Sequence, residues 1–137
     1  GLSSFATLGG GTDNVIGIGS SAAGLLGGDS NRIGDFCYGS VLGGGVRNRI
    51  VSAETEVSVN GSSPDSVLMG GVENVVDRSQ QAVLAGGYRN SLGKSDNSVI
   101  AGGSQNLITN SLSAVVAGGS DNAASKGLHF GHSTVRH

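Results

Sequence analysis

Hydrophobic and polar positions repeat in a fixed order along most of this chain. Two aliphatic residues are followed by a small residue, by Gly-Gly, by two variable positions and then by Asn, as in Val-Leu-Ala-Gly-Gly-Tyr-Arg-Asn at 83–90. A polar residue directly precedes each of these asparagines, and an apolar residue stands two positions after it. The asparagines are Asn14, Asn31, Asn48, Asn74, Asn90, Asn106 and Asn122. Self-similarity at a period of 16 or 17 residues predicts a solenoid.

The residues of one repeat predict strands rather than helices. The apolar runs are short, rich in Val, Leu and Ile, and bounded by Gly and Asn. Each Gly inside a helix would cost about 1 kcal/mol, so Gly-Gly in every repeat argues against helices. We expect two short strands per coil, one at the paired aliphatics and one after the Asn. Gly and Asn would provide the positive φ of tight corners, and the Asn side chains would form a hydrogen-bonded ladder.

Two segments break the period and suggest a domain plan. The spacing of 26 between Asn48 and Asn74 equals one 16-residue coil plus ten residues, which places an insertion at 51–65. Apolar and polar residues alternate there and lead to Asn60-Gly61, a tight-turn dipeptide, so the insertion is predicted to be a hairpin. The repeat ends near residue 127. We therefore expect a β-roll head domain at 1–127 and an irregular cap, or the start of another segment, at 128–137, where three histidines occur: His129, His132 and His137.

The first strand of each coil has two adjacent apolar residues, for example Val83-Leu84 and Val99-Ile100. Successive side chains of a strand point to opposite faces, so both faces are expected to be dry. A thin coil covers only one face with its own interior. The sequence therefore predicts self-association through the other face, and this argument leaves the symmetry open.

Composition limits the partners and cofactors. The 137 residues include 26 Gly and one Cys, and only 13% are charged, with a net charge of −2. This balance provides no electrostatic basis for nucleic-acid binding, and no apolar run is long enough for direct membrane insertion. Cys37 is alone, and the chain has no zinc-ligand spacing, no Ser-His-Asp order and no paired carboxylates. We expect no cofactor, no metal and no enzymatic activity.

Several segments resemble the YadA-like head domain of trimeric autotransporter adhesins and related fibre-tip proteins. The matching segments are Ser-Val-Leu-Met-Gly at 66–70, Ser-Val-Ile-Ala-Gly at 98–102 and Ala-Val-Val-Ala-Gly at 114–118. The resemblance extends over about residues 5–125. The coil of that family is slightly shorter and commonly reads Ser-Val-Ala-Ile-Gly, whereas Gly-Gly-x-x-Asn replaces its second half here.

That resemblance implies an all-β fold, a left-handed parallel β-roll solenoid of about seven coils of 16–17 residues. It implies an intertwined or side-by-side homotrimer. It also implies an adhesin at the tip of a surface fibre, either an outer-membrane-attached fibre or a virion fibre, that recognises a host or prey cell surface. The partner would be a cell-surface glycan or a protein receptor.

Candidate ligand-binding residues lie in the insertion and at the polar corners. Loops on rigid scaffolds often carry recognition, and Arg and Tyr side chains suit sugars and acidic polysaccharides. The hypothesis comprises Arg47, Arg49, Glu54, Glu56, Asn60, Asp65, Tyr88 and Arg89.

Three other functions compete with adhesion. A purely structural spacer in a phage or cell-surface fibre would use the same repeat. A trimeric β-helix acyltransferase needs a six-residue aliphatic period, which a 16-residue coil does not match. An ice-binding solenoid needs Thr in register on one face, and the five Thr residues of this chain do not recur in register.

Overall fold

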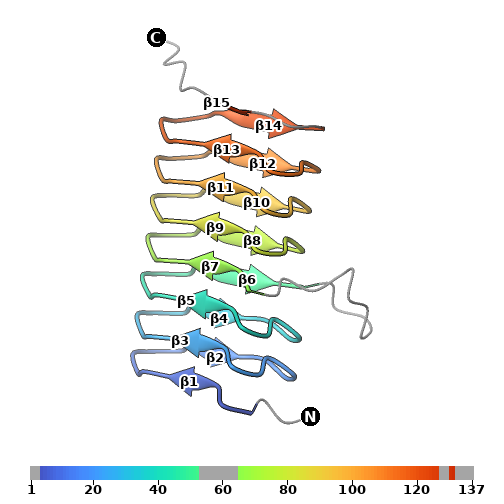
Figure 1. The fold of residues 1–137 in the computed structure, drawn as a ribbon. Helices are drawn as coiled ribbons and strands as arrows, with labels where there is room; N and C mark the ends of the chain where they lie inside the picture. The colour runs from blue at the N-terminus through green and yellow to red at the C-terminus, as the bar shows by residue number, and fades with distance from the viewer. Residues whose placement is uncertain (1–3, 53–64, 127–129, 132–137) are drawn as a thin grey trace.

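The protein is a parallel β-solenoid. The computed structural model describes residues 4–52, 65–126 and 130–131, and within them the chain winds through about seven stacked coils of short strands and corners (Figure 1). These residues form strands, turns and bends and no helix. The all-β solenoid predicted from the repeat is confirmed.

Each coil contributes one strand to each of two parallel sheets. The first sheet of the described residues has eight strands in the order β1-β3-β5-β7-β9-β11-β13-β15. Their bounds are Thr7–Leu8, Gly24–Leu25, Val41–Leu42, Val67–Leu68, Val83–Leu84, Val99–Ile100, Val115–Val116 and Phe130–Gly131.

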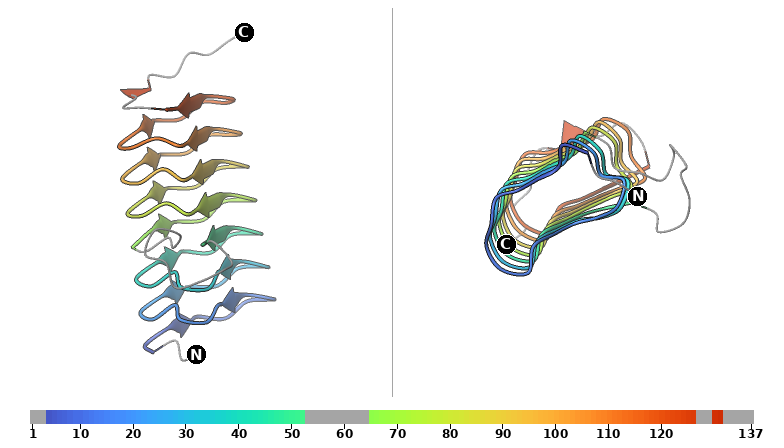
Figure 2. Two further views of the ribbon diagram at one scale, coloured as in Figure 1. Left: turned by 90° about the vertical axis from the view of Figure 1, so that its right-hand side faces the viewer. Right: turned by 90° about the horizontal axis from the view of Figure 1, so that it is seen from below.

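The second sheet of the same residues has seven strands in the order β14-β12-β10-β8-β6-β4-β2. In chain order, β2 to β14 span Val15–Ile16, Arg32–Ile33, Arg49–Val51, Val75–Asp77, Ser91–Gly93, Leu107–Thr109 and Ala123–Ser125. Seen along the column, the coils superimpose as a flattened ring (Figure 2).

A third, thinner ladder closes the ring between the Gly-Gly corner and the Asn. It consists of single-residue parallel bridges that link Thr12, Asp29, Val46, Val72, Tyr88, Ser104 and Ser120 in successive coils. The Asn-to-Asn contacts join residues 17 apart in the first coils, 26 apart across the insertion and 16 apart afterwards. The insertion therefore leaves the stacking register intact.

The hydrophobic core is a narrow column between the two sheets. The second residue of each odd-numbered strand from β3 to β11 is fully buried, as is the second residue of each even-numbered strand from β4 to β12. In the last described full coil, Val116 and Ala124 are 4% and 8% exposed. The core residues of the two sheets are Leu25, Leu42, Leu68, Leu84, Ile100 and Val116, and Ile33, Ile50, Val76, Leu92, Ile108 and Ala124.

A buried asparagine ladder runs beside this column, as the sequence predicted. In the Asn90 rung, Nδ2 donates to the carbonyls of Gly86 at 2.9 Å and Gly103 at 3.0 Å. Oδ1 of Asn90 accepts the backbone N–H of Asn106 at 2.9 Å, and Oδ1 of Asn74 accepts that of Asn90 at 2.9 Å. Through its side chain and its backbone N–H, Asn90 thus links its own coil to the coils before and after it, and a polar residue can be buried because its amide is satisfied.

The prediction of positive φ at the corners is right for the glycines and wrong for the asparagines. The paired glycines do take positive φ, for example 140° at Gly86 and 95° at Gly87. The asparagines do not. The residue just before each Asn takes it instead, with φ near 53° at Arg47, 56° at Glu73 and 53° at Arg89. The Asn is placed to hydrogen-bond neighbouring coils, and the left-handed turn falls one position earlier.

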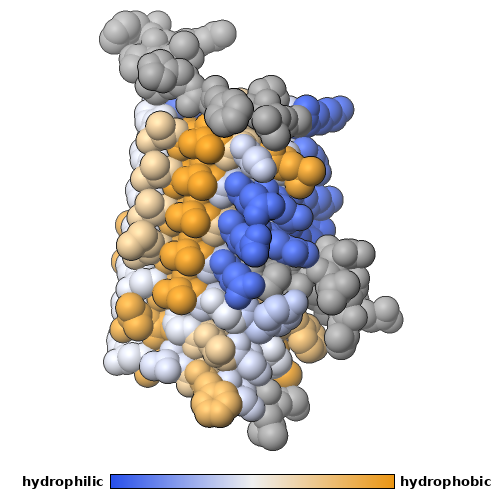
Figure 3. Space-filling view, in the orientation of Figure 1, coloured by the Kyte–Doolittle hydropathy of each residue, from blue (hydrophilic) through white to orange (hydrophobic). Residues whose placement is uncertain are grey.

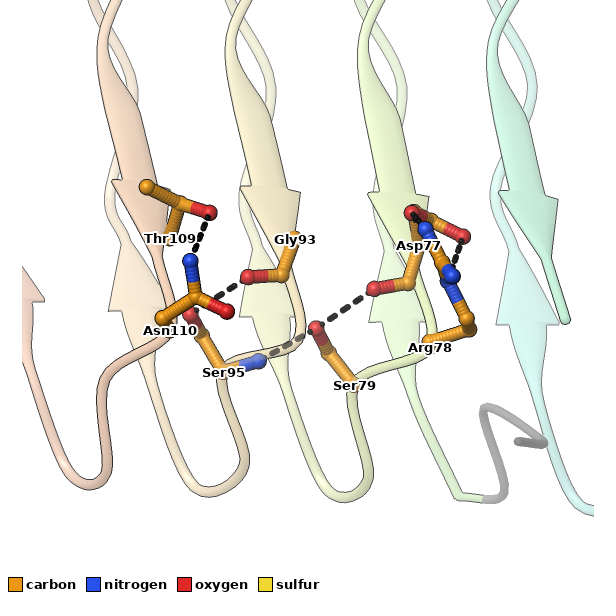
Figure 4. A network of polar contacts seen from close by, with 7 residues as sticks. All are labelled: Asp77, Arg78, Ser79, Gly93, Ser95, Thr109 and Asn110. Atoms are coloured by element: carbon orange, nitrogen blue, oxygen red, sulfur yellow. Dashed lines mark hydrogen bonds and ion pairs between the residues drawn. The ribbon is translucent and has the colours of Figure 1, made fainter. Parts of the chain in front are cut away.

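Buried serines form a second polar ladder at another corner (Figure 4). Ser79 Oγ donates to the carbonyl of Asp77 at 2.9 Å and accepts the N–H of Ser95 at 2.9 Å. Ser95 Oγ donates to Gly93 at 2.8 Å and accepts the N–H of Ser111 at 3.2 Å. Backbone donors at this corner are therefore satisfied from one coil to the next.

The insertion is shorter than the predicted range of 51–65. Val51 belongs to β6, in register with Asp77, and the N–H of Asp65 bonds the carbonyl of Tyr38 in the preceding coil. Both ends are therefore parts of regular coils. The predicted hairpin itself falls on 53–64, outside the described residues. His129, His132 and His137 also lie outside them, whereas β15 continues the first sheet by pairing with β13.

Candidate functional site

The outward face of the first sheet carries an apolar band along the column. The first residue of each odd-numbered strand from β5 to β13 is a valine that is partly exposed, 37% in the case of Val41. The residue after the strand adds a parallel, exposed column at β3, β7, β9, β11 and β13, whereas β5 is followed by the half-buried Gly43. We call these residues together the apolar band: Val41, Val67, Val83, Val99 and Val115, with Leu26, Met69, Ala85, Ala101 and Ala117.

Figure 3 shows the band as a continuous apolar strip beside a polar region. The expectation that both faces of this strand are dry is therefore met on the inner face alone within a single chain. Leu26 and Met69 are more than half exposed, at 61% and 63%. Monomeric proteins seldom leave such a contiguous strip in water.

A charged cluster occupies the corner before the Asn ladder. Glu73 lies between two arginines of the adjacent coils, with its Oε1 3.3 Å from Arg47 Nη1 and its Oε2 2.6 Å from Arg89 Nε. The hydrogen bond from Arg89 is the main reason that the pKa of Glu73 lies below its ordinary value, and Arg47 adds to the effect. The same pairing raises the pKa of Arg89. Arg89 also stacks over the ring of Tyr88, 4.7 Å from its centroid.

The structure distributes the predicted ligand-binding residues over separate places. Arg47, Tyr88 and Arg89 come together at the Glu73 corner. Arg49 lies on the outward face of β6, where it is exposed. Asp65 lies at a different corner, with its carboxylate against Gly39. Glu54, Glu56 and Asn60 lie outside the described residues.

Two charged residues of these surfaces were missed by the sequence analysis. Glu73 holds both corner arginines, and its position before an Asn, in line with Arg47 and Arg89, is the signal that could have identified it. Arg32 is the direct register partner of Arg49 in the neighbouring coil. Both arginines stand one position after a repeat Asn, and that shared position could have paired them.

The described residues contain no group of three or more His, Cys, Asp or Glu side chains placed to hold a metal ion. In the same part of the chain, no helix is long and apolar enough to cross a membrane. Comparison with known proteins adds no family, because no protein-family model and no curated protein sequence matches the chain. The fold and surfaces define a parallel β-solenoid with one apolar sheet face and polar, charged corners.

Proposed function

We propose that this chain is the head of a homotrimeric surface fibre, a left-handed β-roll that acts as an adhesin toward a host or prey cell surface. The observation that carries the proposal is the apolar band. It lies on the scaffold in register from coil to coil, so it offers a repeated and uncharged contact surface along the column.

A second copy of the chain is the occupant that best matches this band. Parallel strands of any such copy repeat at the same spacing of about 4.8 Å, so valines of two copies can pack rung against rung. The small side chains Ala85, Ala101 and Ala117 beside them allow close approach of the backbones. No charged residue belongs to the band, which suits burial in an interface core. Threefold symmetry and the left-handed coil are taken from the resemblance to YadA-like heads.

The proposal of adhesion is supported by the different chemistry of the two sides of the solenoid, one apolar and one polar and charged. Once the apolar band is covered by other copies, the second sheet and the charged corners remain outside. Stacked coils hold their side chains at fixed intervals, and a rigid array of this kind lets many weak contacts add up on a surface. No catalytic constellation was found in the sequence, so we propose binding without turnover.

Binding of the purified protein to a glycan array and to whole cells tests the proposal. We expect retention on at least one glycan class or on a cell surface, with no chemical change in the bound ligand. The absence of binding to glycans, cells and extracted surface proteins would contradict adhesion and favour the spacer.

A spacer remains the second candidate because the coils after residue 66 follow one another without interruption. The discriminating variant replaces residues 53–64 by Ser-Gln. This graft matches the coil of β8, because Ser52 and Asp65 occupy the positions of Arg78 and Gln81 there. If adhesion depends on the insertion, the graft loses binding and keeps the oligomer. Retained cell binding would assign recognition to the coils themselves.

A further inference from the structure

We propose that Arg32 and Arg49 together form a site for the anionic group of an acidic polysaccharide, a carboxylate or a sulfate. This proposal rests on the proposed adhesive function and names the class of ligand. It departs from the sequence-based hypothesis, because Arg32 was not part of it and because the corner arginines prove to be engaged elsewhere.

The two arginines are direct neighbours on the outward face of the second sheet. Arg32 in β4 and Arg49 in β6 are register partners in a parallel pair, and both are exposed. Neighbouring parallel strands lie about 4.8 Å apart, so both side chains leave the sheet side by side. Their strand neighbours Ile33 and Ile50 are fully buried, and this alternation fixes the arginines outward.

Among the five arginines of the described part of the chain, these two are the ones without an ion pair there. Arg47 and Arg89 are held by Glu73. Arg78 is held by Asp77, with three contacts of 2.8 to 3.1 Å. Within the described part of the chain, Arg32 and Arg49 therefore form a pair of positive charges without a carboxylate partner, on a chain whose net charge is −2.

This juxtaposition is unfavourable by itself. Like charges directly opposite each other on neighbouring strands destabilise a sheet. The corresponding positions of the other coils avoid the conflict, since they are occupied by Val15, Val75, Ser91, Leu107 and Ala123. A local conflict of this kind in an otherwise regular scaffold is typical of a functional site. A bound anion removes the repulsion between the two guanidinium groups.

The chemistry of the pair selects an oxyanion. A guanidinium presents a planar fork of N–H donors that matches two oxygens of a carboxylate or a sulfate. Two forks one coil apart can bracket a single such group or hold adjacent groups of a chain. The flanking Val15 and Val75 are apolar and carry no competing carboxylate. An acidic sugar polymer supplies both the repeated oxyanions and the apolar ring faces.

The test measures binding of the full chain to polygalacturonate, which carries carboxylates, and to dextran sulfate, with neutral dextran as the blank. The variant Arg32→Gln/Arg49→Gln is compared with Lys94→Gln/Lys126→Gln. The second variant removes the same charge from two exposed lysines at another corner, which follow β10 and β14 and have one coil between them. We expect the arginine variant to weaken binding about tenfold or more and the lysine variant less than about twofold, as charged hydrogen bonds imply.

A conservative variant separates recognition by the guanidinium fork from attraction by the positive charge alone. Arg32→Lys/Arg49→Lys keeps the charge and is expected to fall between wild type and the Gln variant. An equal loss in the arginine and lysine variants would show diffuse attraction and overturn the site. Arginine-dependent binding of single-stranded DNA of equal charge, without binding of either polysaccharide, would also overturn it.

The outcomes distinguish this proposal from the adhesive function. If wild type and Arg32→Gln/Arg49→Gln bind neutral glycans or cells equally well, the adhesive function stands and the arginine site is refuted. Wild type that binds no cell or glycan on the array refutes adhesion, whereas arginine-dependent binding of the two polyanions would still stand. Anion binding that appears only after Glu54→Gln/Glu56→Gln would mean that the chain's own carboxylates neutralise the pair, and this also refutes the site.

Discussion

At the scale of single residues, the solenoid depends on buried polar side chains, because its coils lack a large hydrophobic core. A coil this thin has few apolar side chains per turn, and its corners carry backbone groups outside the two sheets. The asparagine amide supplies the partners, since in Asn90 it bonds one carbonyl of its own coil and one of the next coil, and accepts an N–H from that next coil. Buried backbone groups without such partners would cost much of the stability of the coil.

Replacing Asn90 by Ala should destabilise the protein by about 3 kcal/mol or more. The carbonyl of Gly86 and the N–H of Asn106 would lose their side-chain partner, and the carbonyl of Gly103 would keep only the N–H of Tyr88. Each buried group left unsatisfied costs about 1–3 kcal/mol. Equilibrium denaturation by guanidinium at fixed protein concentration measures the change. Ser104→Ala, on the thin ladder of the next coil, serves as control and should shift stability by less than about 0.5 kcal/mol. Equal effects of the two substitutions would contradict a role for the ladder.

The two glycines of one corner should differ in their tolerance of Ala. At Gly86 a Cβ would have ordinary contacts, the nearest at 3.7 Å from the carbonyl oxygen of Gly70, so the cost is backbone strain of about 1–3 kcal/mol. At Gly87 the Cβ would overlap the carbonyl oxygen of Gly103 and lie 2.7 Å from Asn90 Nδ2. We expect Gly87→Ala to be clearly the more destabilising in the same denaturation assay. The reverse order would show that φ alone, rather than coil spacing, requires Gly-Gly.

At the scale of the coil, corner side chains couple one turn to the next. Glu73 joins Arg47 and Arg89, which belong to the coils on either side of its own. Each of the three side chains is exposed to some degree, with 69% exposure at Arg47. Exposed ion pairs of this kind contribute little, and salt screens them. The cluster therefore links the corners of three coils and contributes little to stability.

The stability contributed by Glu73 should depend on pH in a definite direction. Because its pKa is lowered in the folded state, the contribution is present above the ordinary glutamate value of 4.5 and is lost as pH falls through the folded-state pKa. The free energies of unfolding of wild type and Glu73→Gln should thus differ near neutral pH and converge in acid. Urea titrations at a series of pH values measure this. A difference that persists unchanged at pH 3, or that grows in acid, would contradict the assignment.

The sequence was sufficient to predict the coil and insufficient to predict its surface chemistry. Regular spacing of paired aliphatics and Asn leads directly to stacked strands and an amide ladder. The left-handed turn before each Asn leaves no residue signal, because Asp, Ser, Arg, Glu and Gln all occur at that position. There the coil geometry imposes the conformation on whatever residue is present. Pairing of Arg47 with Glu73, and of Arg49 with Arg32, requires the register of neighbouring coils, including the coil that bears the insertion.

At the scale of the whole molecule, the apolar band is the feature that one chain leaves incomplete. The inner face of the first sheet is buried against the second sheet, whereas Val41, Leu26 and Met69 remain 37% to 63% exposed. Covering a strip of this kind is favourable by roughly 25 cal/mol for each Å² of apolar surface removed from water. An assembly of several copies, as proposed above, is the simplest arrangement in which that surface is covered.

The mass of the protein in solution tests the central proposal most directly. Light scattering coupled to size-exclusion chromatography should give three times the chain mass for wild type. Val83→Asp/Val99→Asp places two carboxylates in the band and should yield folded monomers, with circular dichroism as the check on the fold. The matched control Ser91→Asp/Leu107→Asp, on the outward face of the second sheet, should remain a trimer. A monodisperse wild-type monomer over the whole accessible concentration range would contradict the account.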